Sequence, residues 1–232
     1  GAVVGLDPAT GAILAMVSSP SFDPNLLASP QTSVEREAWT NLTNAPASPL
    51  LNRSLAQVYP PGSTFKLVTA AAALSTGKYT KDSVIPGPAT LKLPLSNNRL
   101  PNENGKACGP SNKTTLENAL RISCNTAFAS LGLAIGNDAI AQQAEKFGFN
   151  QSFSVPLNSA TSNYPLDADR PQTALSAIGQ FDVRSTVLQM ACLIPGHYEA
   201  GMKGQVQVLG SLSSVPAPSP SVPADDHSTH KH

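Results

Sequence analysis

The sequence feature that most constrains the fold is an abrupt break in the chain followed directly by a helical pattern. Pro60, Pro61 and Gly62 come immediately before an alanine- and leucine-rich run that stops at Gly77. Proline fixes φ and removes an amide donor, so neither a helix nor a central strand can run through the break. The run that follows has high helix propensity, and glycine commonly ends a helix. We therefore predict a helix from Ser63 to about Thr76.

This predicted helix carries a hydroxyl and an amine three residues apart, on Ser63 and Lys66. Helical spacing puts both groups on one face. A partly desolvated lysine beside a serine has a lowered pKa and can take the hydroxyl proton, and a helix N-terminus favours a developing oxyanion. A second Ser-x-x-Lys, from Ser75 to Lys78, spans the expected helix end at Gly77. We interpret that second copy as structural.

A second candidate pair, Ser123 and Asn125, lies between two predicted helices. A hydroxyl there can relay a proton to a leaving nitrogen, and a carboxamide offers one donor and one acceptor to a substrate amide. The same Ser-x-Asn form recurs at Ser96 and Asn98 in what reads as a polar turn, and such residues often cap helices. The joint occurrence with Ser-x-x-Lys is what favours a catalytic site.

The rest of the chain predicts short elements separated by turns rich in proline, glycine and asparagine. We expect an antiparallel hairpin over residues 2–7 and 12–18, a helical piece around 34–42, a strand at 89–95, helices at 115–122, 126–135 and 139–147, and two helical segments within 171–190. Thr114 to Glu117 fits a capping box, and Asp138 is expected to cap the helix that follows it.

Composition excludes several classes of protein. The 15 Lys and Arg balance the 15 Asp and Glu, and charged residues make up 13% of the chain, so no basic surface indicates nucleic-acid binding. No apolar run reaches the ~20 residues that cross a bilayer. Cys108, Cys124 and Cys192 lack metal-ligand spacing, so we expect no metal site. A disulfide between Cys108 and Cys124 is one possibility, which would leave an odd cysteine.

Several ordered pieces resemble the transpeptidase domain of class B penicillin-binding proteins, most of all the actinobacterial members. The pieces are residues 6–18 (LDPATGAILAMVS), 20–25 (PSFDPN), 52–53 (NR), 59–66 (YPPGSTFK), 123–128 (SCNTAF), 178–180 (IGQ) and 188–190 (LQM). Two of them contain the Ser-x-x-Lys and Ser-x-Asn-type elements of penicillin-recognising enzymes. The resemblance implies a penicillin-binding protein/β-lactamase-like α/β (α+β) fold, with an antiparallel sheet flanked by helices.

The resemblance also implies a role for each candidate residue. Ser63 would be the acylated nucleophile, Lys66 its general base, Ser123 the proton shuttle and Asn125 the group that binds the donor peptide amide. The implied enzyme is a serine-type D,D-transpeptidase that attacks the D-Ala-D-Ala bond of peptidoglycan stem peptides and transfers the acyl group to a neighbouring amine. β-Lactam antibiotics would acylate Ser63 as covalent inhibitors. No metal or organic cofactor is expected.

The family's third element, a Lys-Thr-Gly or Lys-Ser-Gly strand, has no match downstream of residues 180–190. Lys203, Gly204 and Gln205 lack the hydroxyl residue. The family uses this strand to recognise the substrate carboxylate and to supply an oxyanion donor, whose loss costs ~10²–10³ in rate. We therefore expect residues 1–192 to form a partial transpeptidase domain, truncated after the helical subdomain. It would be a poor catalyst, and its helices near Ser63 would lack the sheet that covers them.

Residues 193–232 are expected to be a divergent, largely disordered tail because their end is rich in serine and proline. His227, His230 and His232 are interpreted as part of a solvated end. We hypothesise that the reading frame or gene model diverges just after Cys192. Transcript sequencing that matches the tail without interruption, with no Lys-Thr-Gly in any frame, would remove that hypothesis.

Two other functions remain open from the sequence. A class A β-lactamase shares the serine, lysine and asparagine elements but deacylates through a glutamate, and no glutamate lies between Glu145 and Glu199. Asp167, Asp169 and Asp182 are the remaining candidate bases. A non-catalytic β-lactam-binding or sensor-like module, acylated at Ser63 without transfer, is the second alternative.

The resemblance also implies where such a protein works. Cross-linking of peptidoglycan takes place on the outer face of the cytoplasmic membrane, so we expect a membrane anchor and a non-catalytic region upstream of Gly1. The parent protein would belong to a cell-wall synthesis complex. The oxidising setting would permit the disulfide.

Overall fold

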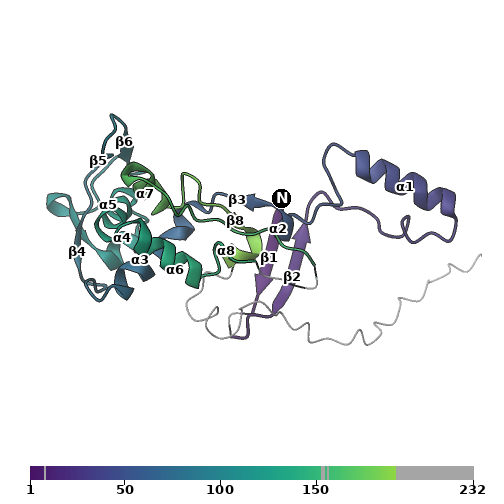
Figure 1. Cartoon of the computed structure of the whole chain (residues 1–232), viewed down its shortest axis with the longest axis horizontal. Coiled ribbons are helices and arrows are strands. Elements are labelled where there is room, and N and C mark those ends of the chain that lie inside the picture. Colours follow the sequence, from purple (N-terminus) through teal and green to yellow (C-terminus); the bar gives the residue numbers. More distant parts are fainter. Residues whose placement is uncertain (8, 153–154, 156, 192–232) are drawn as a thin grey trace, which may run out of the picture.

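The computed structural model describes residues 1–7, 9–152, 155 and 157–191 (Figure 1). Cys192, Lys203 to Gln205 and the C-terminal histidines therefore lie outside the described residues, as does the expected tail. The elements in chain order are β1 (Ala2–Leu6), β2 (Ile13–Ser18), α1 (Thr32–Asn44), α2 (Arg53–Ala56), β3 (Val58–Tyr59), η1 (Gly62–Phe65), α3 (Lys66–Ser75), β4 (Val84–Pro86), β5 (Thr90–Lys92), β6 (Arg99–Pro101), η2 (Pro110–Asn112), β7 (Lys113–Thr115), α4 (Leu116–Arg121), α5 (Asn125–Ile135), α6 (Asn137–Lys146), α7 (Arg170–Ser176), β8 (Ser185–Thr186) and α8 (Val187–Ala191).

The strands form four small antiparallel sheets, which pair β1 with β2, β3 with β8, β4 with β7 and β5 with β6. The predicted N-terminal hairpin is confirmed, with Val4 opposite Met16. One side of it packs on a small cluster that contains Leu55 and Leu188. The mixed α/β class is therefore as expected, and the described sheets are small.

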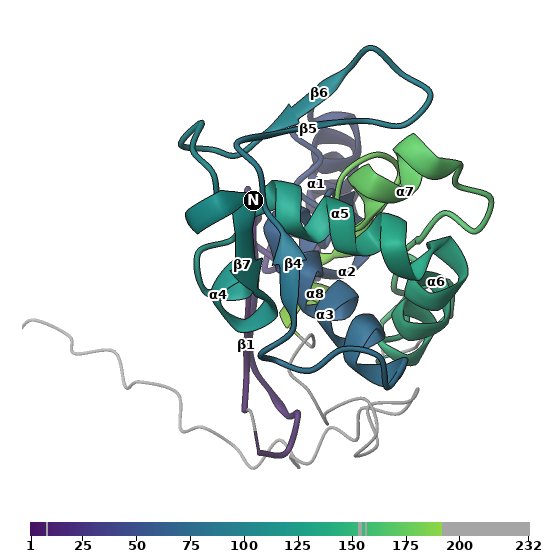
Figure 2. The ribbon, with the colours of Figure 1, turned by 90° about the vertical axis from the view of Figure 1, so that its left-hand side faces the viewer.

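The helices around Ser63 are covered by other helices and loops. In Figure 2, α3 lies beside α5 and α6, and side chains from all three helices are buried. Val68 on α3 packs in one cluster with Ile140 on α6 and with Tyr164. No large sheet covers α3 in the described residues, as expected, and the segments after α6 pack over it instead.

The close contact between α5 and α7 depends on a glycine. A Cβ built at Gly132 on α5 would lie 2.4 Å from the Cβ of Ala177, the residue at the C-terminal end of α7. Figure 2 shows the two helices side by side. The absence of a side chain at Gly132 therefore sets the distance between these helices.

Several boundaries differ from the predicted ones. The strand expected at residues 89–95 is the shorter β5, which pairs with β6. The expected helical pair within residues 171–190 contains α7, the short strand β8 and α8. Thr115, not Thr114, caps α4 by accepting from the Asn118 amide, because Thr114 is paired in β7. Gly136, not Asp138, precedes α6, whose first turn contains Asp138.

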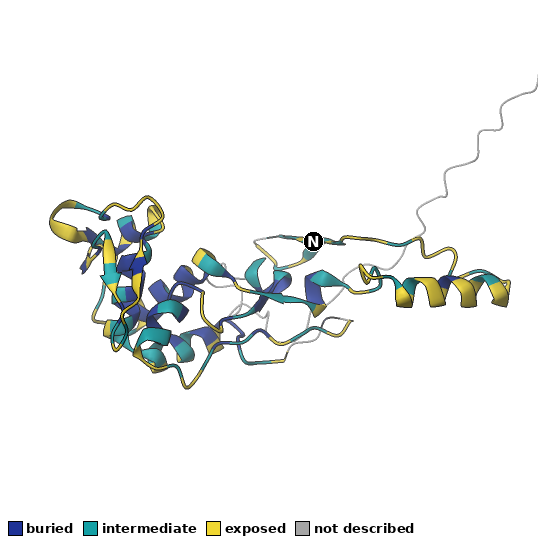
Figure 3. Ribbon diagram, turned by 90° about the horizontal axis from the view of Figure 1, so that it is seen from above, coloured by how far each residue is buried: buried dark blue, intermediate teal, exposed yellow. Residues whose placement is uncertain are grey.

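Helix α1 lies at the far end of the molecule from the helical body (Figure 1). It extends beyond the predicted 34–42 piece, and Ala38 is its buried residue. Figure 3 shows this helix largely exposed, whereas buried residues gather around α3 and α5. No helix in the described ranges combines the length and the hydropathy that a membrane span requires.

Candidate active site

The backbone turn that holds Ser63 is a short 3-10 helix. Prediction placed Ser63 in the first α-helical turn, but η1 spans Gly62–Phe65 and α3 begins at Lys66. Pro60 and Pro61 cannot donate the amide bonds that would extend the helix backwards. Ser63 is an exposed residue at this corner.

A second glycine holds this turn from across the molecule. The Gly62 amide donates to the Gly179 carbonyl at 3.0 Å. Gly179 has φ of +71°, and a Cβ at that position would lie 2.1 Å from the Gly62 carbonyl oxygen. The Ser63 turn therefore depends on a backbone contact that only glycine permits.

Phe65, which precedes Lys66 in the sequence, is fully buried in the core. Its ring meets Phe149 edge-on at 5.3 Å and stacks on Tyr164 at 5.5 Å between centroids. These contacts fix the end of η1, directly before Lys66, against Phe149 and Tyr164.

Lys66 is 1% exposed, and its Nζ lies at the centre of the site. It contacts Ser63 Oγ at 3.1 Å, Ser123 Oγ at 3.0 Å, the Ser123 carbonyl oxygen at 2.8 Å and Asn125 Oδ1 at 2.6 Å. The structure thus brings all four predicted site residues together around one amine.

The hydrogen-bond partners of the Lys66 amine show how its neutral form can accept a proton. A neutral amine has two N–H donors and one lone pair. The Ser123 carbonyl and Asn125 Oδ1 can only accept, so they take the two donors. The lone pair is then left for a hydroxyl of Ser63 or Ser123, the arrangement that a general base requires.

Burial lowers the pKa of Lys66 to about 8, and the carboxylate of Glu103 opposes that shift. The Phe128 ring centroid lies 6.0 Å from Nζ, at the outer limit of a cation–π contact. A lysine near this pKa is partly neutral at mildly alkaline pH. It can therefore accept a proton from a hydroxyl at a modest cost.

Ser123 lies in the short connection between α4 and α5 with φ of +55°. Cys124 caps α5, and its Sγ accepts from the Ala127 amide at 3.3 Å. The same cysteine is bonded to Cys108, so the disulfide considered from the sequence is present. Asn125 is the first residue of α5. The disulfide and the cap together fix the loop that carries Ser123.

The model of the penicillin binding protein transpeptidase domain matches residues 1–231. The chain belongs to this transpeptidase family. Within the family it is similar to mycobacterial proteins, as the resemblance predicted.

This transpeptidase-family chain is 45% identical over 192 residues to the peptidoglycan D,D-transpeptidase PbpA of Mycolicibacterium smegmatis, which covers 82% of this chain and 39% of that protein. PbpA of Mycobacterium tuberculosis is 43% identical over 213 residues, covering 91% and 43%. The chain spans about two fifths of the length of these curated relatives. A solved ceftriaxone acyl-enzyme complex of M. tuberculosis penicillin-binding protein A superposes with a TM-score of 0.77 at 45% identity, covering 82% of this chain and 43% of that one.

The other candidate residues lie away from this site. Ser75 contacts Gln143 at 3.1 Å, and Ser96 accepts from the Asn98 amide at 3.0 Å within a turn, so both second copies are structural as predicted. Asp169 caps α7. Asp167 and Asp182 line a different hollow beside Tyr164. In the described part of the chain, no hydrogen bond joins any of these aspartates to Ser63 or Lys66.

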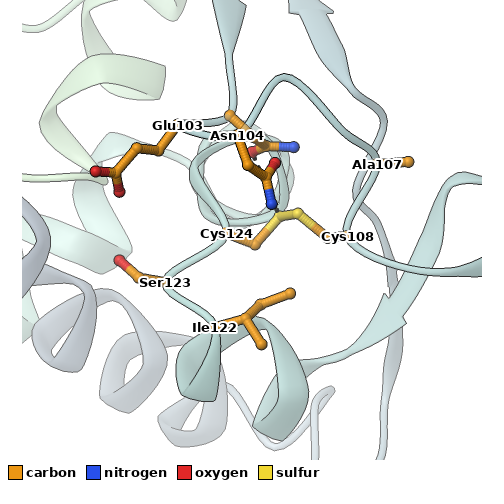
Figure 4. Close-up of a pocket in the computed structure, with 8 residues that line it drawn as sticks. Glu103, Asn104, Ala107, Cys108, Ile122, Ser123 and Cys124 are labelled. Atoms are coloured by element: carbon orange, nitrogen blue, oxygen red, sulfur yellow. Dashed lines mark hydrogen bonds between the residues drawn. A yellow bond between two sulfur atoms is a disulfide. The ribbon is translucent and has the colours of Figure 1, made fainter.

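Two residues that the sequence did not indicate border the site. Asn102 is 6% exposed and accepts from the Thr126 amide at 3.0 Å, in the first turn of the helix that begins with Asn125. Glu103 follows it and borders a pocket of about 360 Å³ beside Ser123 (Figure 4). No local motif marks either residue, because these contacts join segments that are distant in the sequence.

Proposed function

We propose that this chain carries the acylation machinery of a peptidoglycan D,D-transpeptidase. The observation that supports the proposal most directly is the single buried amine of Lys66 in contact with both Ser63 Oγ and Ser123 Oγ. The relatives named as peptidoglycan D,D-transpeptidases and the β-lactam acyl-enzyme of a similar structure support the same chemistry. Ser63 is the proposed nucleophile, Lys66 the base, Ser123 the proton shuttle and Asn125 the substrate-binding residue.

In the first step, neutral Lys66 takes the Ser63 proton while Oγ bonds to the carbonyl carbon of the penultimate D-Ala. The carbon–nitrogen bond to the terminal D-Ala then breaks. Ser123 donates a proton to that leaving nitrogen and regains one from Lys66. The products are an ester on Ser63 and free D-Ala. Asn125 positions the donor peptide by hydrogen bonds to its amide.

A β-lactam follows the same first step, but its leaving nitrogen stays attached to the acyl group. The ester then persists unless a base activates water. Residues 146–198 contain no glutamate. Of the aspartates in that range, Asp167 and Asp182 line another hollow and Asp169 caps α7. We therefore expect a long-lived adduct on Ser63.

Intact-mass measurement after incubation with benzylpenicillin tests this proposal. We expect one added benzylpenicillin on the wild-type chain and none on Ser63→Ala. Ser75→Ala is the matched control, because it removes the other Ser-x-x-Lys serine, and it should be labelled like the wild type. An unlabelled wild-type chain, or a labelled Ser63→Ala chain, would contradict the proposed function.

We further propose that the protein acts on the outer side of the cytoplasmic membrane, is held there by an anchor elsewhere in its sequence, and works within a cell-wall synthesis complex. The Cys108–Cys124 disulfide favours an oxidising compartment. The domain boundary near Cys192 stays a prediction. Labelling of intact cells with a membrane-impermeant fluorescent penicillin tests the location, since a cytoplasmic protein would label only after lysis.

A further inference from the structure

A pocket lies beside Ser123. Residues from two segments line it: Glu103, Asn104 and Ala107 come from the loop after β6, and Ile122 and Ser123 come from the end of α4 (Figure 4). The Cys108–Cys124 disulfide joins the two segments. A volume of about 360 Å³ suits a side chain or a short peptide segment.

The position of Glu103 in this pocket is fixed by its neighbour. Asn102 donates from Nδ2 to the Pro88 carbonyl at 3.0 Å and to the Lys106 carbonyl at 2.8 Å, and its Oδ1 accepts from the Thr126 amide. These bonds hold the loop against the first turn of α5. Glu103 is therefore held at a constant place relative to Ser123.

Glu103 supplies the charge of the pocket. It is the one charged residue among those that line it. In Figure 4 its carboxylate and the Ser123 hydroxyl extend to the same side of the pocket. Within the described part of the chain, no hydrogen bond or ion pair engages this carboxylate, and its field reaches Lys66. A carboxylate that lacks a direct hydrogen-bond or ion-pair partner in the described residues and lies in a pocket beside Ser123 favours a cationic ligand.

We propose that this pocket binds the ammonium group of the acceptor peptide, with Glu103 as the residue that positions it beside Ser123 for attack on the Ser63 ester. The inference rests on the proposed function and names the second substrate of the same site. Aliphatic amines with a pKa near ~10 are ammonium ions at neutral pH, so the acceptor arrives with the charge that Glu103 attracts.

The transfer step balances without a further reactant. The bound ammonium loses one proton to solvent, and the resulting amine bonds to the acyl carbon. The carbon–oxygen bond to Ser63 breaks, and the second nitrogen proton passes through Ser123 and Lys66 to the Ser63 oxygen. Glu103 binds and orients the amine, and it takes no part in bond making.

The first test is binding, which does not require acylation. The probe is a peptide with blocked termini and one lysine side chain, and its matched control is the same peptide with that amine acetylated. In titrations of the 15N-labelled chain, we expect the ammonium peptide to shift the amides of Asn104 and Ser123. Binding should weaken with added salt. Equal binding of the acetylated peptide, or no binding, would overturn the inference.

Two variants test whether Glu103 itself binds the ammonium group. Glu103→Gln should weaken binding of the ammonium peptide by about 2- to 5-fold, the range for an exposed charge pair. Glu145→Gln removes an exposed carboxylate on α6 and should bind like the wild type. A Glu103→Gln chain that binds as tightly as Glu145→Gln would contradict the role of Glu103.

A second measurement separates this inference from the proposed function. The Ser63 ester formed from a thioester substrate partitions between water and an added amine, and the inference predicts a higher KM for the amine in Glu103→Gln. Loss of benzylpenicillin labelling in the wild type would defeat the proposed function. Normal labelling with an unchanged amine KM would defeat only the acceptor site.

Discussion

Lys66 sets the pH dependence expected at the scale of single residues. Burial lowers its pKa to about 8, so the amine is mostly protonated at pH 7 and mostly neutral at pH 9. Only the neutral amine can take the Ser63 proton. We expect the second-order rate constant for acylation by benzylpenicillin to rise about 10-fold per pH unit below 8 and to level off above it.

The matched variant for this profile is Lys66→Arg, which keeps a cation but has no accessible neutral form. It should lose about 10²–10⁴-fold in acylation rate at every pH. A wild-type profile without a step between pH 7 and 9, or an arginine variant of normal rate, would show that Lys66 is not the base.

The site shows what a sequence can reveal at this scale and what it cannot. Ser63 and Lys66 were predictable because their spacing puts both side chains on one face of a helix. Ser123 and Asn125 were predictable because their motif occurs together with that pair. The sharp turn at Gly62 was indicated too, although as an α-helical rather than a 3-10 turn. Asn102 and Glu103 reach the site through tertiary contacts, for which no spacing rule exists.

At the scale of elements, Gly132 controls the packing of α5 against α7. Gly132→Ala would put a methyl group into the space occupied by Ala177, so the helices must separate. We expect a loss of about 1–3 kcal/mol in the free energy of unfolding, measured by urea denaturation. Ser130→Ala is the control on the same helix. It removes a hydroxyl that has no hydrogen-bond partner among the described residues and should change stability little.

If Gly132→Ala were as stable as the wild type, α5 and α7 would not be in firm contact.

Element boundaries were predictable only where the sequence marks them. Helix α6 was predicted within a few residues because Gly136 and Gly148 bracket it, whereas β8 is too short to be recognised. A two-residue strand exists only because β3 pairs with it.

The Cys108–Cys124 disulfide links the β6 loop to α5 across 16 residues of sequence. Loop closure of that length corresponds to ~3 kcal/mol of stability. We expect the Cys108→Ala, Cys124→Ala double variant to lose about that much free energy of unfolding, which urea denaturation shows as a lower midpoint. A reducing agent should lower the wild-type midpoint similarly and leave the double variant unchanged. A wild type indifferent to reduction would contradict the prediction.

At the scale of the whole molecule, the site depends on segments from both halves of the described chain. Gly179→Ala should strain the backbone at position 179, where φ is +71°. The added methyl group should also push the Gly62 carbonyl away. We expect acylation of Ser63 to fall at least about 10-fold, because small displacements of a nucleophile are costly. Labelling rates with benzylpenicillin measure the effect.

Gly77→Ala is the matched control for that variant. Gly77 has φ of +70°, nearly that of Gly179, but a Cβ there would meet no neighbour within 4 Å in the part of the chain that the structure describes. Backbone strain alone costs about 1–2 kcal/mol. If both variants acylate equally slowly, the contact with Gly62 is unimportant and strain explains the loss.

The Gly62–Gly179 contact also has a consequence for the order in which the protein is completed during synthesis. A nascent chain that has emerged only as far as α5 already contains Ser63, Lys66, Ser123 and Asn125. It lacks the backbone carbonyl that holds the serine turn, which arrives only when Gly179 emerges. Stalled chains of increasing length should therefore gain reactivity toward benzylpenicillin abruptly once Gly179 has left the ribosome.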